Sequence, residues 1–289
     1  MAGFIKNILW PTDFSPEGQG ALLYAGLFAE AFSARITALH VHPDLALAIY
    51  ADSPIIVREL ENRKEQVNKQ AQARLQAVEK KRGLAFKKVV VAEGSPAKKI
   101  IATAEQEKAD LIVMGKKGET TLERVLIGSV ANHVLRHSSV PVLMTKKTKP
   151  PLAVKKIIVP TDFTKEEDFE REVAWDLAQA FGASLTFLYV LELYGHEYRM
   201  VDHMFEHTLA RFQRRAHKGR KGVEVSKDVT RAFTAAAGIE KYARERGFDL
   251  IVMATCARAL GRFFLGSSTE KVISSTNLPV FAIPPHLCR

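Results

Sequence analysis

The sequence predicts an α/β fold in which parallel sheets carry helices on both faces, arranged as two domains in tandem. Apolar runs too short for a helix alternate with segments of helical periodicity, which is the pattern of βαβ units with right-handed crossovers. The pentapeptide Asp110–Met114 recurs unchanged at Asp249–Met253, which indicates a duplicated domain and not a solenoid repeat. The length of 289 residues also fits two domains of about 150 residues each.

The predicted elements of the first half alternate strictly. The strands are apolar runs bounded by turn residues, at Ile5–Trp10, Ile36–Val41, Lys87–Ala92, Leu111–Met114 and Val140–Met144. The helices carry apolar residues three or four positions apart, at Glu17–Phe32, Pro54–Arg82, Ser95–Lys108 and Val130–His137. In such a sheet ligands bind beyond the carboxyl ends of the strands, where the strand order reverses.

The second half restates the first at its strand ends. Lys155–Thr164 repeats the pattern of Lys6–Ser15, and Leu278–Phe281 matches Val140–Leu143. A short basic, proline-containing segment separates the two copies and has the composition of a linker. We therefore expect domains at residues 1–147 and 153–289.

A glycine loop follows the strand at Leu111–Met114. Gly115 and Gly118 are followed, after nine further residues, by Gly128-Ser129 at the start of a helix. Glycines let the backbone approach a ligand closely, and a helix N-terminus offers unpaired N–H groups and the positive end of a dipole. The spacing favours a phosphate site. The structural alternatives are that Gly128-Ser129 only caps a helix and that Gly115 only ends a strand.

Composition restricts the function classes. The net charge of +10 raises the possibility of nucleic-acid binding, but basic and acidic residues alternate along residues 58–82, as on a solvated helix face. We expect a cytoplasmic protein with no membrane segment, because no apolar run approaches about 18 residues. Pro11 and Asp13 interrupt any N-terminal signal-like run, and Cys256 and Cys288 form no framework or metal spacing.

Several motifs together resemble a known family. They are Pro11–Ser15, Gly94–Ala97, the pattern G-x2-G-x9-G-S from Gly115 to Ser129, and the strand at Val140–Val142. With them the sequence resembles a tandem universal stress protein over essentially the whole chain. The resemblance implies five-stranded parallel-sheet domains of the adenine-nucleotide α-hydrolase-like, Rossmann-like type. It also implies binding of ATP or AMP by members that keep the glycines, pairing of the two domains through their last strands, and a homodimer.

The resemblance also implies a set of binding residues. Pro11, Thr12 and Asp13 would line the adenosine pocket, and Val41 would offer backbone groups to the base. The ribose and phosphates would be surrounded by Met114, Gly115, Lys117, Gly118, Gly128, Ser129 and Val130. Lys116 and Lys117 would screen phosphate charge or simply face solvent. Asp13 would hold a ribose hydroxyl or a hydrated Mg²⁺, or alternatively cap the first helix.

The second copy departs from this pattern. Ala254 and Ala257 replace the two loop glycines, although Gly266-Ser267 is retained. An alanine does not readily adopt a positive φ, and its Cβ would approach the phosphates. Family members without the glycines tend not to bind nucleotide. We therefore expect one tight nucleotide site per chain.

The function expected from these features is a nucleotide-dependent stress-response or signalling module. The alternatives are a slow ATPase and a nucleotide-free interaction scaffold. The sequence contains neither a Walker motif nor G-x-S-x-G, and only His40 and His42 are candidates for activating water, so we assign no catalytic residue. His203 and His207, one turn apart on a predicted helix, are a candidate zinc pair; the alternative is an ordinary polar helix face.

Overall fold

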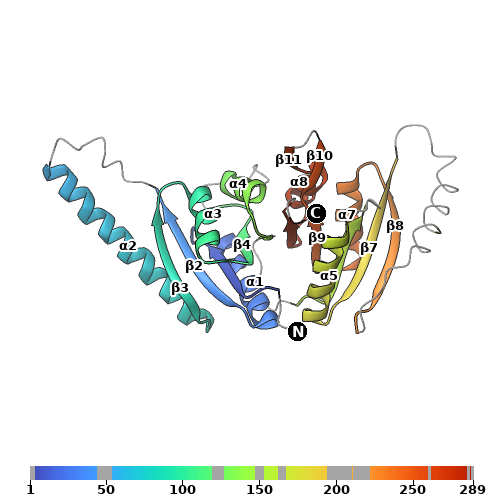
Figure 1. Ribbon diagram of the computed structural model, residues 1–289, viewed down its shortest axis with the longest axis horizontal. Helices are drawn as coiled ribbons and strands as arrows, with labels where there is room; N and C mark the ends of the chain where they lie inside the picture. The colour runs from blue at the N-terminus through green and yellow to red at the C-terminus, as the bar shows by residue number, and fades with distance from the viewer. Residues whose placement is uncertain are drawn as a thin grey trace.

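The computed structural model describes residues 4–43, 54–118, 127–146, 153–161, 167–193, 210, 222–259, 262–284 and 287. A single ten-stranded sheet runs through both halves in the order β3-β2-β1-β4-β5-β12-β9-β6-β7-β8 (Figure 1). The strands of the first half are β1 (Asn7–Pro11), β2 (Arg35–His42), β3 (Phe86–Glu93), β4 (Leu111–Gly115) and β5 (Val142–Thr145). Those of the second half are β6 (Lys156–Thr161), β7 (Ser184–Glu192), β8 (Val225–Ala232), β9 (Leu250–Ala254) and β12 (Val280–Ile283).

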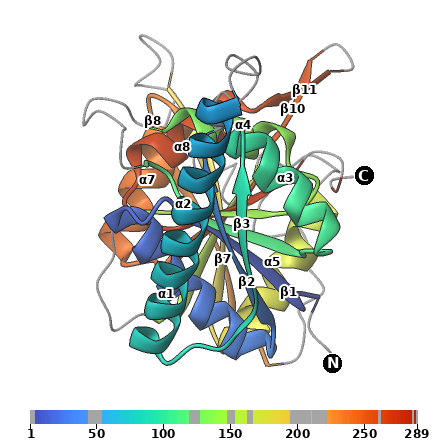
Figure 2. The same ribbon diagram turned by 90° about the vertical axis from the view of Figure 1, so that its left-hand side faces the viewer.

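Helices cover both faces of this sheet. The helices of the first half are α1 (Pro16–Phe32), α2 (Pro54–Arg82), α3 (Pro96–Gln106) and α4 (Ser129–His137). Those of the second half are α5 (Glu167–Phe181), α7 (Ala235–Arg246) and α8 (Ser267–Ser275). The apolar faces of α1, α2 and α5 pack into one core layer, and those of α3, α4, α7 and α8 pack into the other. The long helix α2 runs along the outer strand β3 (Figure 2). The predicted α/β fold is confirmed, but the sheets of the two halves are joined into one by the pairing of β5 with β12.

The predicted elements of the first half are all present, with ends shifted by at most two residues. The largest shifts have local causes. β5 begins at Val142 instead of Val140, because the Ser138 side chain bonds both backbone groups of Val140 in a turn, with the Ser138 hydroxyl donating to the Val140 carbonyl at 2.7 Å. Pro141, which has no N–H, then leads into the strand.

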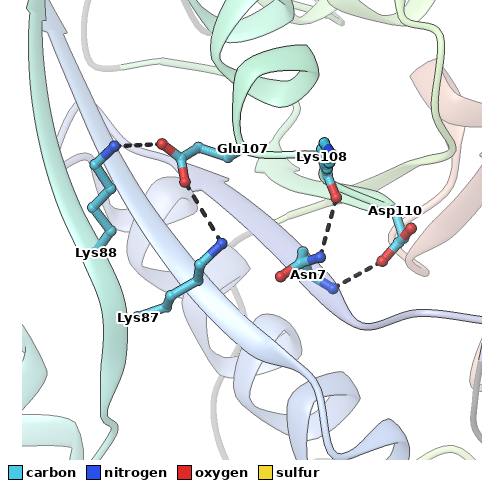
Figure 3. A network of polar contacts seen from close by, with 6 residues as sticks. All are labelled: Asn7, Lys87, Lys88, Glu107, Lys108 and Asp110. Carbon is cyan, nitrogen blue, oxygen red and sulfur yellow. Dashed lines mark hydrogen bonds and ion pairs between the residues drawn. The ribbon is translucent and has the colours of Figure 1, made fainter.

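The repeated aspartates join neighbouring strands at the amino edge of the sheet. Asp110 Oδ2 accepts hydrogen bonds from the backbone N–H groups of Lys6 and Asn7 at 2.8 and 2.9 Å. Figure 3 shows the bond from Asn7. Asp249 Oδ2 accepts the corresponding pair from Lys155 and Lys156 at 2.8 and 3.0 Å. This edge lies opposite the carboxyl ends of the strands, so the unchanged pentapeptide maintains the scaffold.

An ion-pair cluster reinforces the same edge in the first half. The carboxylate of Glu107, just after α3, contacts the ammonium groups of Lys87 and Lys88 on β3 at 3.6 and 2.5 Å (Figure 3). These bonds lower the pKa of Glu107 below its ordinary value, the hydrogen bond from Lys88 being the largest cause. Two of the basic residues that contribute to the positive charge are therefore paired.

The two halves meet along their last strands. β5 and β12 pair antiparallel, with Met144 opposite Val280 and Val142 opposite Ala282. Beneath this junction the ring of Phe28 packs edge-on against Phe181, with the ring centroids 4.9 Å apart. It also stacks on Phe281, with the centroids 6.2 Å apart. The expected pairing of the two domains through their last strands is therefore present. Among the described helices, none is both long and apolar enough to cross a membrane.

Candidate functional site

The turn after β1 is held by its own polar side chains. Thr12 Oγ1 accepts from the Phe14 N–H at 3.0 Å, and Asp13 Oδ1 accepts from the Ser15 N–H at 3.0 Å. Ser15 is the N-cap of α1 and accepts from the Gly18 N–H at 3.1 Å. The suggested capping role of Asp13 was therefore wrong: its carboxylate closes the turn one step earlier. Phe14 has a positive φ of 65°, a backbone strain that the two side-chain bonds around it help to hold.

Strand order brings this turn beside the glycine loop. β1 pairs in parallel with β2 on one side and with β4 on the other, so the chain winds outward in opposite directions from β1 and β4. This is the point at which open α/β sheets bind ligands. The carboxyl ends of β1 and β4 lie next to each other there.

A cavity of about 340 Å³ opens at this position, within the usual range of about 300–1,000 Å³ for small-molecule sites. All of the predicted binding residues line it: Pro11, Thr12, Asp13, Val41, Met114, Gly115, Lys117, Gly118, Gly128, Ser129 and Val130. Seven further lining residues were not among the predicted binding residues, although His40 was a candidate for activating water. They are Gly18, Leu39, His40, Pro43, Pro96, Ile100 and Ala131. Most of these are apolar residues of β2, α3 and α4. No local sequence motif indicates that such residues face a cavity.

The first turn of α4 forms one wall of the cavity. Its N-cap is Gly128, and no side chain caps the helix. The Gly128 N–H donates to the Lys116 carbonyl at 2.7 Å, which fixes the entry of the chain into the helix. Ser129 and Val130 follow at the cavity with Ser129 exposed. An uncapped helix start beside a cavity is suited to an anion.

Helix packing also requires a glycine at position 115. A Cβ at this position would lie 2.9 Å from the Glu17 carbonyl carbon and 3.1 Å from the Gly18 nitrogen. Both are backbone atoms of the first turn of α1, so neither can move aside without shifting the helix. The glycine therefore permits the close approach of α1 to the end of β4 and also lines the cavity.

Lys116 does not face the cavity or the solvent, so both interpretations of this residue were wrong. Its side chain is buried at 2% exposure and crosses into the second half. There Nζ donates to the carbonyls of Ile273 and Thr276 at 2.5 and 2.6 Å, at the carboxyl end of α8. A cation is favourable at that end of a helix dipole. Burial lowers the pKa of Lys116 from 10.5 to about 8.

Lys117 lines the cavity as predicted, but its backbone is already engaged. The Lys117 N–H donates to Glu17 Oε2 at 2.8 Å. A carboxylate therefore lies beside the expected phosphate region, and the contribution of Lys117 to an anion comes from its side chain. No local pattern in the sequence pointed to Glu17, which reaches this amide across 100 residues.

His40 is the titratable ring of the cavity. Its Nδ1 donates to the Thr12 carbonyl at 2.8 Å, and its ring packs on Phe14 at 4.7 Å. Burial is the largest cause of a pKa below the ordinary 6.5, and the positive charge of Arg74 acts in the same direction. His42, in contrast, is buried and contacts Asn68 Oδ1 of α2 at 2.8 Å. Its position is that of a packed strand residue.

Known proteins match both halves of this chain. The model of the universal stress protein family matches residues 5–146 and 153–284. The chain belongs to the universal stress protein family. Its two matched segments are two universal stress protein domains in tandem.

The relatives differ in how much of this universal stress protein they cover. Universal stress protein MJ0577 of Methanocaldococcus jannaschii is 32% identical over an alignment of 160 residues that covers 51% of this chain and 98% of that protein. MJ0531 of the same organism is 36% identical over 147 residues, 50% of this chain and 84% of that protein. A solved universal stress protein from Archaeoglobus fulgidus spans 96% of this chain and 98% of its own, with a TM-score of 0.66 and 25% identity.

In the second universal stress protein domain, side chains from two helices bind the backbone of the residue that ends β9. The Ala254 N–H donates to Glu170 Oε1 of α5 at 2.8 Å, and Thr269 Oγ1 of α8 donates to the Ala254 carbonyl at 2.8 Å. Beyond Ala254 the chain forms a hairpin of β10 (Cys256–Ala259) and β11 (Arg262–Leu265). These contacts distinguish the second domain from the first at the strand end where a ligand would bind.

The described residues contain no group of three or more histidine, cysteine, aspartate or glutamate side chains arranged for a metal ion. The candidate zinc ligands His203 and His207 lie outside the described residues.

Proposed function

We propose that the first domain of this universal stress protein binds an adenine nucleotide, ATP or AMP, and that the protein acts as a nucleotide-dependent stress-response or signalling module. The observation that carries the proposal is the cavity at the carboxyl ends of β1 and β4. Its lining combines apolar walls with a helix start and a lysine, which is the combination that a flat base with an anionic tail requires.

The apolar part of the cavity suits the base. Leu39, Ile100 and Met114 provide walls, and Val41 lines the cavity near the end of β2. A purine buried between such walls gains hydrophobic stabilisation, and its ring nitrogens and amino group need hydrogen-bond partners that strand ends supply.

The polar part suits the ribose and phosphates. The first turn of α4 and the Lys117 side chain would hold the phosphates, and the Asp13 carboxylate would hold a ribose hydroxyl or a hydrated Mg²⁺. Mg²⁺ keeps several of its waters when it binds through a carboxylate and substrate phosphates. The negative charge of the Glu17 carboxylate would repel the phosphates. A bound metal ion or the Lys117 ammonium would offset this repulsion.

Calorimetric titration of the full chain with ATP and AMP tests the proposal. We expect one site per chain, weakened about fivefold or more by Lys117→Met, because a cation next to a phosphate is removed. Lys271→Met, which removes an exposed lysine from α8 of the second domain, is the matched control and should bind as the parent does. Absence of binding by the parent would instead favour the nucleotide-free scaffold.

Asp13 requires a conservative variant. Asp13→Asn keeps the oxygen that accepts the Ser15 N–H and removes only the charge, whereas alanine would also open the turn. We expect Asp13→Asn to reduce the dependence of ATP affinity on Mg²⁺. The same samples, monitored for phosphate release, test the slow ATPase: sustained turnover above the buffer rate would favour it.

A further inference from the structure

A second set of side chains with binding chemistry lies on α4, outside the cavity. His133 and His137 are one helical turn apart, and their rings lie nearly parallel, with centroids 4.2 Å apart and planes 22° apart. His133 is half-buried and His137 is exposed. Two imidazoles at this spacing on a helix are able to bind one metal ion through both rings.

A hydrogen bond prepares one of the two rings. His137 Nδ1 lies 2.8 Å from the His133 carbonyl oxygen. A carbonyl only accepts, so Nδ1 carries the proton, and the neutral ring keeps its lone pair on Nε2. Histidines that bind metals commonly donate their other ring nitrogen to a carbonyl or carboxylate in this way, which sets the tautomer and the ring orientation.

The nearest cation on the helix is directed elsewhere. Arg136, which lies between the two histidines in sequence, donates to Asn132 Oδ1 at 2.6 Å and to Glu270 Oε2 of α8 at 2.9 Å. Its charge is therefore paired across the domain junction. The helix itself is anchored at its start by the bond from Gly128 to Lys116, so little backbone ordering accompanies binding at its second and third turns.

From this geometry we propose that His133 and His137 form a two-imidazole site for a late first-row divalent metal ion. Water completes the coordination, because the described residues offer no third side-chain ligand there. Nitrogen ligands of this kind follow the Irving–Williams order, so Cu²⁺ binds more tightly than Ni²⁺ or Zn²⁺. A bound ion joins two successive turns of α4, the helix whose first turn forms a wall of the nucleotide cavity.

The experiment uses the full chain as four proteins, because the chain contains another H-x3-H pair. They are the parent, His133→Gln/His137→Gln, His203→Gln/His207→Gln, and the variant with all four substitutions. Each is titrated with Cu²⁺ and, separately, with Zn²⁺ by calorimetry. Electron paramagnetic resonance of the Cu²⁺ samples reports how many nitrogens bind the metal, and circular dichroism confirms that each variant is folded.

In the His203→Gln/His207→Gln background, we expect one Cu²⁺ to bind with a spectrum of two nitrogen ligands. Adding His133→Gln/His137→Gln should weaken that binding roughly tenfold or more, since loss of an outer-shell partner alone costs that much. Single substitution of either histidine should leave one nitrogen ligand. If titration and spectrum are unchanged when His133 and His137 are replaced, the ion is bound elsewhere or only adventitiously, and the proposal is overturned.

Discussion

Gly115 and Ala254 occupy corresponding positions in the two domains and differ by one methyl group. In the first domain the end of β4 lies against the backbone of Glu17 and Gly18, and a Cβ there would come within 2.9 Å of a main-chain atom. In the second domain the described part of α5 starts at Glu167, and Glu170 reaches the Ala254 amide through its side chain. Gly115 is therefore needed because the first turn of α1 lies against the end of β4. The glycine motif in the sequence does not by itself indicate this contact.

We expect Gly115→Ala to destabilise the protein by about 1–3 kcal/mol, the usual cost of overpacking, and to weaken ATP binding because α1 must shift. The reciprocal change Ala254→Gly should cost about 1 kcal/mol or less, since it only adds backbone freedom. Urea denaturation and ATP titration of both variants measure these effects. Equal losses in the two domains would contradict the packing argument.

His40 should make stability depend on pH. Its pKa in the folded protein lies below the ordinary 6.5, chiefly through burial. The contribution is therefore complete above pH 6.5 and is lost as the pH falls from there through the folded-state pKa. An NMR titration should show the His40 ring titrating below 6.5, and His40→Gln should remove part of the acid-side loss. A midpoint above 6.5 in the nucleotide-free protein would be inconsistent with this environment.

The lining of the cavity was predictable at the residue scale, but Lys116 was not. The glycine spacing from Gly115 to Ser129 indicated a phosphate site, and the family resemblance placed Pro11 and Asp13 in the pocket beside it. Lys116 lies between the two loop glycines, Gly115 and Gly118. The carbonyl groups that its side chain contacts, at the end of α8, are 157 and 160 residues away in the sequence. A contact between domains leaves no local periodicity, so the sequence suggested only phosphate or solvent as the surroundings of this lysine.

At the scale of elements, the sequence predicted the strands and helices of the first half because each begins or ends at a strong signal. α2 was placed at Pro54–Arg82, where the structure has it, since its apolar positions recur over the full length and a proline opens it. The element that was missed is the β10–β11 hairpin. Its residues read as a loop because they replace the glycine loop of the first domain.

Asp110 and Asp249 hold corresponding strand ends in the two domains, so we expect the same effect from replacing either of them. Asp110→Ala and Asp249→Ala each remove an acceptor shared by two backbone N–H groups. We expect each to cost about 1–3 kcal/mol in unfolding free energy, the penalty for unsatisfied groups. Both sites lie on the edge opposite the cavity, so ATP affinity per folded chain should not change. A loss of affinity in Asp110→Ala would mean that the two edges are coupled.

At the scale of the whole molecule, Lys116 makes the domain junction sensitive to alkaline pH. Burial lowers its pKa from 10.5 to about 8, so between these values the unfolded chain binds more protons than the folded chain. The contribution of Lys116 to stability therefore rises with pH across that window. We expect the parent to gain stability relative to Lys116→Met from pH 8 to 10.5, measured by urea denaturation. Parallel curves for the two proteins would contradict this.

The tandem architecture was foreseen from the duplicated strands, and the junction from family resemblance. The homodimer and the domain limits at 147 and 153 stay predictions. What no pattern in the sequence conveyed is how the junction is filled: by the ring of Phe28 against Phe181 and Phe281, and by the Arg136–Glu270 ion pair between α4 and α8. These contacts join residues more than 130 positions apart, in part through side chains that look like ordinary surface charges.

The antiparallel junction of β5 with β12 has a consequence for composition inside the cell. Since both strands belong to one polypeptide, their association does not weaken on dilution and does not depend on the amount of protein made. Separate subunits with the same edges would exchange members freely. Here each first domain, which carries the loop glycines, is synthesised together with one second domain, which carries alanines at those positions. The ratio of the two domains is therefore always one to one.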